Sequence, residues 1–321
     1  MKPKVFVTRI IPDAGLDRVK QFCDADIWPD DMPPLYDILI QRVKGVEGIL
    51  CVLTDRIDGN LMDAAGKQLK VISQMAVGYD NIDIAAAQER GIPVGNTPGV
   101  LTEATADLTF ALLLAHARRI VEGVEYIREG KWRTWEPKAL LGADLSGATL
   151  GIVGLGRIGK AVARRASGFD LRILAYSPSL TAEDAAINAH RVELDDLLHE
   201  SDFVSLHCPL NKDTRHLMNK DTFAKMKPTA ILINTTRGPV VDQKALYAAL
   251  KNGVIAGAAL DVTDPEPMPS DDPLLTLPNV TIVPHIGSAS KWTRDQMATM
   301  AAENLIAGLK GEPLPNEVRK K

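Results

Sequence analysis

The chain has 321 residues, of which 45% are hydrophobic and 24% are charged, the mixture typical of a globular protein. This length predicts two domains. Its 37 basic and 41 acidic residues leave a net charge of −4, which argues against nucleic acid or an anionic membrane surface as the main partner.

The cysteine content and the hydropathy of the sequence exclude further classes of protein. Cys23, Cys51 and Cys208 match neither a disulfide framework nor a metal-ligand spacing, so we expect no metal site. The longest apolar stretch, 108–117, is too short to cross a bilayer, and the first residues lack the apolar segment of a signal peptide. We therefore expect a cytoplasmic protein without a membrane partner.

Short β-rich runs alternate with helical stretches over residues 1–99, which predicts a parallel sheet. The expected strands are 4–8, 48–53, 71–76 and 93–96. The expected helices are 14–22, 35–43, 60–65 and 82–89. After the turn at Pro98-Gly99, apolar residues at helical spacing predict a long helix over 102–120.

A second alternation begins at Thr149 and predicts a doubly wound sheet of six strands. These strands are 149–153, 172–176, 203–207, 230–234, 257–262 and 280–283. A final helix over 290–309 has no sheet partner in its own half, so we expect it to return to the first domain. The predicted fold is α/β, with a doubly wound domain over 100–287 inserted into a flavodoxin-like domain built from 1–99 and 288–321. A crevice between two such domains usually binds a small ligand.

The first strand of the inserted domain leads into Gly154-Leu155-Gly156-Arg157-Ile158-Gly159, followed by a helical stretch. In a dinucleotide-binding turn, Gly154 permits the tight turn, Gly156 allows backbone to approach the pyrophosphate, and Gly159 allows close packing of helix on strand. The helix N-terminus then faces the phosphates with free N–H groups. The context of strand, turn and helix predicts a Rossmann domain that binds NAD or NADP.

The end of the second strand bears on which dinucleotide is bound. The acidic residue that holds the ribose of NAD is expected there, but the chain has Tyr176-Ser177-Pro178-Ser179. Ser177 and Ser179 could donate hydrogen bonds to a 2′-phosphate, although no Arg or Lys follows closely. The sequence favours NADP(H) and leaves NAD(H) open.

Three charged residues follow strands late in the inserted domain: Arg237, Glu266 and His285. Ligands bind outside the carboxyl ends of parallel strands, so all three can converge there. Arg offers a planar fork for a carboxylate, His can protonate a carbonyl oxygen, and Glu can stabilise the cationic imidazole. Hydride transfer from a nicotinamide would complete a reduction.

Taken singly, each of these residues has a plainer interpretation. Arg237 and Glu266 could be solvated loop charges, and His285 could be a capping histidine. The other five histidines are expected to be structural or on the surface, and Cys208 to be a small residue of the cofactor-site wall rather than a nucleophile. The joint placement of three such residues beside a dinucleotide turn favours a catalytic site.

On these motifs the chain resembles the D-isomer-specific 2-hydroxyacid dehydrogenases over nearly its whole length. The resemblance rests on the glycine turn 154–159 and on the segments 234–238, 259–262, 264–267 and 284–288. It implies that Arg237 anchors the substrate, that Glu266 modulates the histidine, and that His285 is the acid/base. Expected cofactor contacts are Gly154, Gly156, Arg157, Ile158, Gly159, Ser177, Cys208, Thr235, Thr236, Asp261, His285 and Gly287.

Within the family, the segments 76–83 and 96–102 resemble the glyoxylate/hydroxypyruvate reductases most. The resemblance implies that the backbone N–H groups of Val77 and Gly78 bind the substrate carboxylate opposite Arg237. Leu53 would close a small pocket. Phosphite dehydrogenases carry a lysine near position 77, where this chain has valine, so a phosphonate-type substrate is disfavoured.

Alternatives remain at this stage: another D-2-hydroxyacid dehydrogenase such as a phosphoglycerate dehydrogenase, or a non-enzymatic NAD(H)-sensing protein like the C-terminal-binding corepressors. The segment 131–137 holds Trp132 and Trp135 between the long helix and the Rossmann strand. These tryptophans could pack a hinge, or could belong to the dimer arm that the resemblance implies. We expect a homodimer in which Trp135 approaches the active site of the second subunit.

Overall fold

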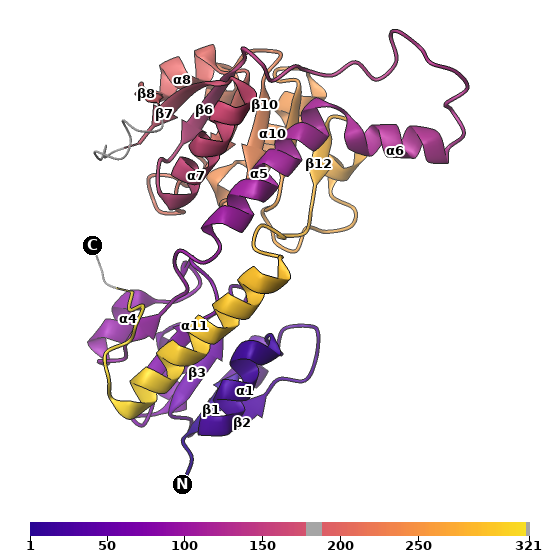
Figure 1. Ribbon diagram of the computed structural model, residues 1–321. Coiled ribbons are helices and arrows are strands. Elements are labelled where there is room, and N and C mark those ends of the chain that lie inside the picture. The colour runs from indigo at the N-terminus through magenta and orange to yellow at the C-terminus, as the bar shows by residue number, and fades with distance from the viewer. Residues whose placement is uncertain (178–187, 319–321) are drawn as a thin grey trace. The chain divides into compact units, whose positions relative to one another are not determined.

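The computed structural model describes residues 1–177 and 188–318, and the chain forms two compact units (Figure 1). We call Met1–Leu101 with Ala289–Lys321 the terminal unit, and Thr102–Ser288 the central unit. Each unit contains a parallel sheet with helices, so the predicted α/β class with two doubly wound sheets is confirmed.

The sheet of the terminal unit has the strand order β2-β1-β3-β4-β5, and every pair in it is parallel. Its strands are β1 (Lys4–Val7), β2 (Asp24–Ile27), β3 (Gly48–Cys51), β4 (Val71–Gln74) and β5 (Val94–Gly95). This order is the flavodoxin-like one. Both faces are covered, since Val5 and Phe6 point into different buried apolar clusters.

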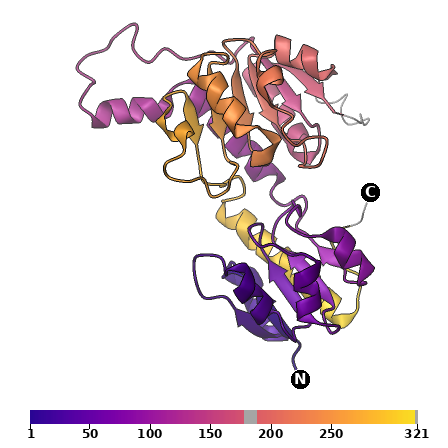
Figure 2. The same cartoon turned by 180° about the vertical axis from the view of Figure 1, so that it is seen from behind.

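Helix α11, from the far end of the sequence, packs in the terminal unit against α1, β3 and β4 (Figures 1 and 2). The helices of this unit are α1 (Asp13–Phe22), α2 (Tyr36–Arg42), α3 (Gly59–Ala65), α4 (Ile84–Glu89) and α11 (Lys291–Lys310). Small buried residues, among them Ala298, Ala301 and Ala302, allow α11 to lie close to its neighbours. The N-terminal strands and the last helix thus share one core.

The sheet of the central unit has the order β12-β11-β10-β9-β6-β7-β8. Its strands are β6 (Thr149–Val153), β7 (Arg172–Tyr176), β8 (Ala189–Arg191), β9 (Phe203–Leu206), β10 (Ile231–Asn234), β11 (Gly257–Leu260) and β12 (Val280–Ile282). The order reverses between β6 and β9, as in a Rossmann sheet, and β12 extends it by one strand. The carboxyl ends of β6 and β9 therefore flank the switch point at which such sheets bind ligands.

Two edge strands, β2 and β8, were not predicted from the sequence. β2 was not expected, and β8 makes the central sheet seven-stranded within the described residues instead of six-stranded. Both edges are polar: β2 reads Asp-Ala-Asp-Ile, and β8 reads Ala-His-Arg. A strand paired on one side alone needs no apolar run, which was the signal used to recognise strands.

The long helix expected over 102–120 is two helices. α5 (Thr102–Ala117) ends early, and α6 (Ile120–Arg128) starts after Arg119, whose left-handed backbone (φ 51°) breaks the helical path. Figures 1 and 2 show α6 and the loop after it extending away from the central sheet, and none of its residues is buried. The other α-helices in this unit's described part are α7 (Arg157–Ala166), α8 (Leu194–Glu200), α9 (Lys220–Phe223) and α10 (Gln243–Lys251). Across the described ranges, none of the helices combines the length and the apolarity that a bilayer span demands.

Candidate active site

The glycine turn lies between β6 and α7. Gly154 has φ +97°, and a Cβ there would come within 2.5 Å of the backbone nitrogen of Cys208. A Cβ on Gly159 would come within 2.2 Å of the carbonyl oxygen of Gly154, whereas Gly156 borders open space. Gly156 is also the N-cap of α7, and as a glycine it has no side chain that could cap this helix end. The open approach and the free helix N-terminus suit a pyrophosphate, so these residues fit a dinucleotide.

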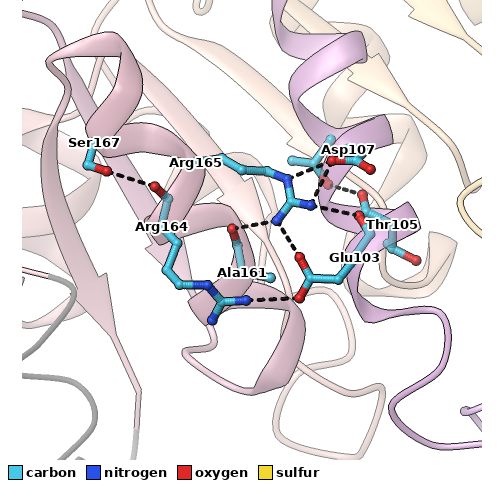
Figure 3. A network of polar contacts seen from close by, with 8 residues as sticks. Glu103, Thr105, Asp107, Ala161, Arg164, Arg165 and Ser167 are labelled. Atoms are coloured by element: carbon cyan, nitrogen blue, oxygen red, sulfur yellow. Dashed lines mark hydrogen bonds and ion pairs between the residues drawn. The ribbon is translucent and has the colours of Figure 1, made fainter.

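Helix α7 is fixed against α5 by a group of ion pairs (Figure 3). Arg165 pairs with Glu103 over 2.8 Å and with Asp107 over 2.7 Å, and Arg164 pairs with Glu103 over 2.9 Å. Because Arg165 also donates to the carbonyl oxygen of Ala161, its guanidinium is held within α7 itself. These ion pairs thus link α5 to the helix whose N-terminus carries the glycine turn.

Further expected cofactor residues lie at the carboxyl ends of β7, β9 and β10. Ser177 directly follows β7 and is buried, while Ser179 lies outside the described residues. The Thr236 hydroxyl donates to the carbonyl oxygen of Cys208 over 2.5 Å, which joins the ends of β9 and β10 beside the glycine turn. Burial raises the pKa of the Cys208 thiol to about 11, which suits a wall residue and not a nucleophile.

The Thr109 hydroxyl, which was not singled out from the sequence, supports Thr235. The Thr235 hydroxyl lies 3.0 Å from that of Thr109 on α5, which itself donates to the carbonyl oxygen of Thr105. With that proton already donated, Thr109 accepts from Thr235, whose hydroxyl is thereby fixed. No local sequence signal marks Thr109, because its role depends on α5 packing against β10.

Arg237 sits in a turn organised by Asn234, the last residue of β10. The Asn234 amide donates to the carbonyl oxygen of Arg237 over 3.0 Å and accepts from the N–H of Thr236 over 3.0 Å. A Cβ on Gly238 would fall 1.8 Å from the carbonyl oxygen of Thr263, so this turn lies directly against the loop that leads to Glu266. An Asn at a strand end is a recognisable turn signal in the sequence.

His285 and Glu266 form a hydrogen-bonded pair. The His285 Nδ1 lies 2.5 Å from a Glu266 carboxylate oxygen, and the two side chains are 23% and 29% exposed. Since a carboxylate only accepts, Nδ1 carries the proton and Nε2 is left to act on a ligand. The carboxylate therefore fixes the orientation of the imidazole ring and the position of its Nδ1 proton.

Asp261 supports that pair from the end of β11. Its carboxylate accepts the backbone N–H groups of Ile286 over 2.6 Å and Gly287 over 2.8 Å. Burial raises the pKa of Asp261, while these two bonds and the charge of His285 oppose the shift. The structure thus brings Asp261, His285, Glu266 and Gly287 together and gives Asp261 a structural task that was not foreseen.

The three expected substrate contacts of the terminal unit lie just beyond carboxyl ends of its sheet. Leu53 follows β3, and Val77 and Gly78 follow β4. All three are half-buried, so each retains some accessible surface. In the described part of the chain, His, Cys, Asp and Glu side chains form no group that could hold a metal ion.

Comparison with known proteins gives a family match that falls within the central unit. Residues 110–287 match the model of the D-isomer specific 2-hydroxyacid dehydrogenase NAD binding domain. The chain belongs to the D-isomer specific 2-hydroxyacid dehydrogenase family. The central unit is accordingly the nicotinamide-cofactor domain of a dehydrogenase, and the resemblance noted in the sequence is confirmed.

Full-length relatives of this dehydrogenase include proteins named as glyoxylate reductases. One from Korarchaeum cryptofilum is 56% identical over 99% of this chain and 96% of its own length. The solved glyoxylate reductase from Paecilomyes thermophila has a TM-score of 0.88 at 32% identity, covering 99% of this chain and 98% of its own. An NADPH-dependent glyoxylate/hydroxypyruvate reductase from Sinorhizobium meliloti, solved with NADP and malonate, has a TM-score of 0.88 at 32% identity, with 99% and 97% covered.

Proposed function

We propose that this dehydrogenase reduces a small 2-oxoacid, glyoxylate or hydroxypyruvate, to the corresponding D-2-hydroxyacid. The observation that carries the proposal is the 2.5 Å contact between His285 and Glu266 in a domain with a dinucleotide turn. The glyoxylate reductases among the full-length relatives support the same substrate class.

In this proposal His285 is the proton donor. A bound dihydronicotinamide would supply the hydride that is added to the carbonyl carbon. Cationic His285 gives its Nε2 proton to the carbonyl oxygen and becomes neutral, while the Nδ1–H stays bonded to Glu266. The carboxylate fixes the ring orientation and stabilises the charged ring before the transfer.

Substrate binding is assigned to groups that match a 2-oxoacid. Arg237 supplies a planar cationic fork for the carboxylate, and the backbone N–H groups of Val77 and Gly78 supply further donors. Leu53 limits the size of the pocket. We accordingly propose that residues 1–99 and 288–321 serve the substrate, and residues 100–287 the dinucleotide.

For the cofactor we propose NADP(H) in preference to NAD(H). The support comes from the end of β7, where Ser177 stands in place of the carboxylate that binds the ribose in NAD-specific proteins. A carboxylate at that position would repel the 2′-phosphate of NADP, whereas a serine does not. The relative from Sinorhizobium meliloti is NADPH-dependent by name. Titrating NADPH and NADH separately at one fixed 2-oxoacid concentration tests the preference, and a higher kcat/KM with NADH would overturn it.

We also propose a cytoplasmic homodimer. Large apolar side chains stand exposed along α6 and the loop after it, including Ile120 (52%), Ile127 (58%) and Trp135 (80%). They border a hollow of about 400 Å³, and a second copy would bury them. In that dimer Trp135 approaches the active site of the other subunit. The free, buried state of all three cysteines fits a reducing compartment.

The experiment for the reaction is a panel of 2-oxoacids offered with each reduced cofactor, followed by loss of nicotinamide absorbance. We expect turnover of glyoxylate and hydroxypyruvate, and a lower kcat/KM for the phosphorylated analogue of hydroxypyruvate. Tight cofactor binding without turnover of any 2-oxoacid would contradict the proposal.

A further inference from the structure

A group of buried amide side chains in the terminal unit surrounds the loop after β4. Asn96 is 9% exposed and Gln74 is fully buried, and neither was singled out in the sequence. Asn96 donates to the carbonyl oxygen of Val77 over 2.8 Å, and Gln74 donates to that of Gly78 over 3.2 Å. The carbonyl oxygen of Ala76 accepts the backbone N–H of Thr97 over 3.0 Å.

These three bonds fix three consecutive peptide planes. Among the described residues, cis peptides occur at two Xaa-Pro bonds only, so the planes from Ala76 to Tyr79 are trans. In a trans peptide the C=O and the following N–H point in opposite directions. With each carbonyl held by the protein, the N–H groups of Val77, Gly78 and Tyr79 point away from those anchors. Within residues 1–177 and 188–318 these N–H groups have no hydrogen-bond partner.

The Gln74 amide has a defined orientation. Its oxygen lies 3.0 Å from the Cys51 sulfur, and its nitrogen donates to the side-chain oxygen of Asn81 over 2.6 Å. A flipped amide would set its oxygen against two other oxygens. Burial also raises the pKa of Cys51 well above its ordinary value, so the neutral thiol remains a donor to Gln74.

Asn81 joins this loop to the loop after β3. Its amide nitrogen donates to the carbonyl oxygen of Asp55 over 2.7 Å and to that of Val52 over 3.2 Å. Leu53 lies between these two anchors. The segment expected to bind the carboxylate and the segment expected to limit the pocket are therefore fastened to each other by one side chain.

We infer that Asn96 and Gln74 are positioning residues that aim the backbone N–H groups of Gly78 and Tyr79, beside that of Val77, at the carboxylate of the substrate. The inference rests on the proposed function and deepens it, since it adds Tyr79 N–H as a third donor and explains why the donors stay aligned. Asn96 aims the N–H of Gly78, and Gln74 aims that of Tyr79. Because the N–H groups are already aligned before the anion binds, the loop does not have to rearrange, and binding of the anion is favoured.

The test exchanges each donor for an acceptor of nearly the same shape. In Asn96→Asp and Gln74→Glu, a carboxylate oxygen faces a peptide carbonyl, and repulsion turns that peptide. We expect the KM for glyoxylate to rise about ten- to hundred-fold, as for loss of one charge-assisted hydrogen bond, with kcat changed much less. The dissociation constant of NADPH, measured by fluorescence, should stay within about twofold because the cofactor binds to the other unit's turn.

Gln68→Glu is the matched control. Gln68 also donates its amide to two backbone carbonyls of the terminal unit, those of Val46 and Ala65, but does not touch the loop after β4. This variant should keep the KM of the wild type. Should Asn96→Asp fail to fold, Asn96→Ala removes the donor without adding charge and should give a smaller rise in KM.

Calorimetric titration of oxalate, an unreactive dicarboxylate of similar size, into the NADPH-saturated protein gives a readout independent of turnover. Its affinity should fall in Asn96→Asp and Gln74→Glu by the same factor as KM rises, and should be unchanged in Gln68→Glu. Unchanged KM and oxalate affinity in both variants of an active enzyme would overturn the inference and leave the proposed function intact. If the wild type reduced no 2-oxoacid, the proposed function would fall, and the oxalate titrations would still decide the inference.

Discussion

The backbone N–H of His285 donates a 2.9 Å hydrogen bond to the carbonyl oxygen of Asp261, the residue that follows β11. His285 itself has φ 52°, a left-handed conformation that is unfavourable for a residue with a Cβ. The Asp261 carboxylate holds the next two N–H groups of the same loop. The direction of the imidazole therefore depends on Asp261 as well as on Glu266.

Asp261→Asn tests this dependence. An amide can accept one of the two loop N–H groups but opposes the other with its own N–H, so a buried donor loses its partner. We expect the free energy of unfolding in urea to fall by about 1–3 kcal/mol and kcat to fall with it. Asp202→Asn, which removes a carboxylate from the N–H of Thr149 at the start of β6, should cost stability without lowering kcat.

Replacing His285 and Glu266 one at a time distinguishes the proton transfer by the imidazole from the support that the carboxylate gives to it. His285→Ala should lower kcat by about a hundred- to ten-thousand-fold, the usual contribution of a general acid, with cofactor affinity largely kept. Glu266→Gln keeps a hydrogen-bond acceptor for Nδ1 but removes the charge, so we expect a smaller fall in kcat. Steady-state kinetics with parallel cofactor titrations measure both, and a His285→Ala enzyme with wild-type kcat would place the acid elsewhere.

Arg237→Ala should act chiefly on substrate affinity. Loss of a charge-assisted, two-pronged contact with the carboxylate is expected to raise the KM for glyoxylate at least tenfold. Arg237→Lys keeps the charge but not the planar fork, so it should recover only part of the affinity. Equal KM values for the wild type and Arg237→Ala would remove the anchoring role.

The strands with apolar runs, the glycine turn and the three charged residues could be predicted because their signals are local. Glu266 and His285 are recognisable from their residue types and from the prolines and glycines around them. The edges β2 and β8 could not be predicted in this way, since one-sided pairing imposes no apolar pattern. The break after α5 depends on a single left-handed residue, Arg119, at a position with no Gly or Pro.

The polar contacts that support the site residues could not be predicted from the sequence, for a physical reason. Gln74 and Asn81 lie close in sequence, but Asn96 reaches Val77 only because β4 and β5 pair in a defined register. Likewise Thr109 meets Thr235 only through the packing of α5. Side chains that act by holding backbone carbonyls form no recognisable pattern of residue types or spacings in the sequence. Residues that act on the substrate are easier to recognise because they carry chemically distinctive groups.

A buried histidine makes stability depend on pH. Burial lowers the pKa of His207 to about 3 from 6.5, and its Nε2 bonds to the Ser205 hydroxyl. Between these pH values the unfolded chain binds a proton that the folded chain does not, so the free energy of unfolding falls as the pH drops below about 6.5 and is retained above it. The slope approaches about 1.4 kcal/mol per pH unit for this one group.

Urea unfolding of the wild type and His207→Gln from pH 7.5 to 5 measures this contribution by difference, because the carboxylates titrate alike in both proteins. The variant should have the shallower dependence even if it is less stable at every pH. Parallel curves for the two proteins would show that His207 takes up its proton in the folded state as readily as in the unfolded chain.

The exposed apolar side chains of α6 provide the last prediction. Ile127→Asp places a charge on a side chain that is 58% exposed, so folding of one subunit should be unaffected, while burial of that charge against a second copy would be costly. Light scattering at micromolar concentration should give a dimer for the wild type and a monomer for Ile127→Asp. Leu275→Asp, at a 50% exposed position outside α6 and its loop, should remain dimeric. A monomeric wild type would remove the dimer proposal and, with it, any role for Trp135 in a neighbouring active site.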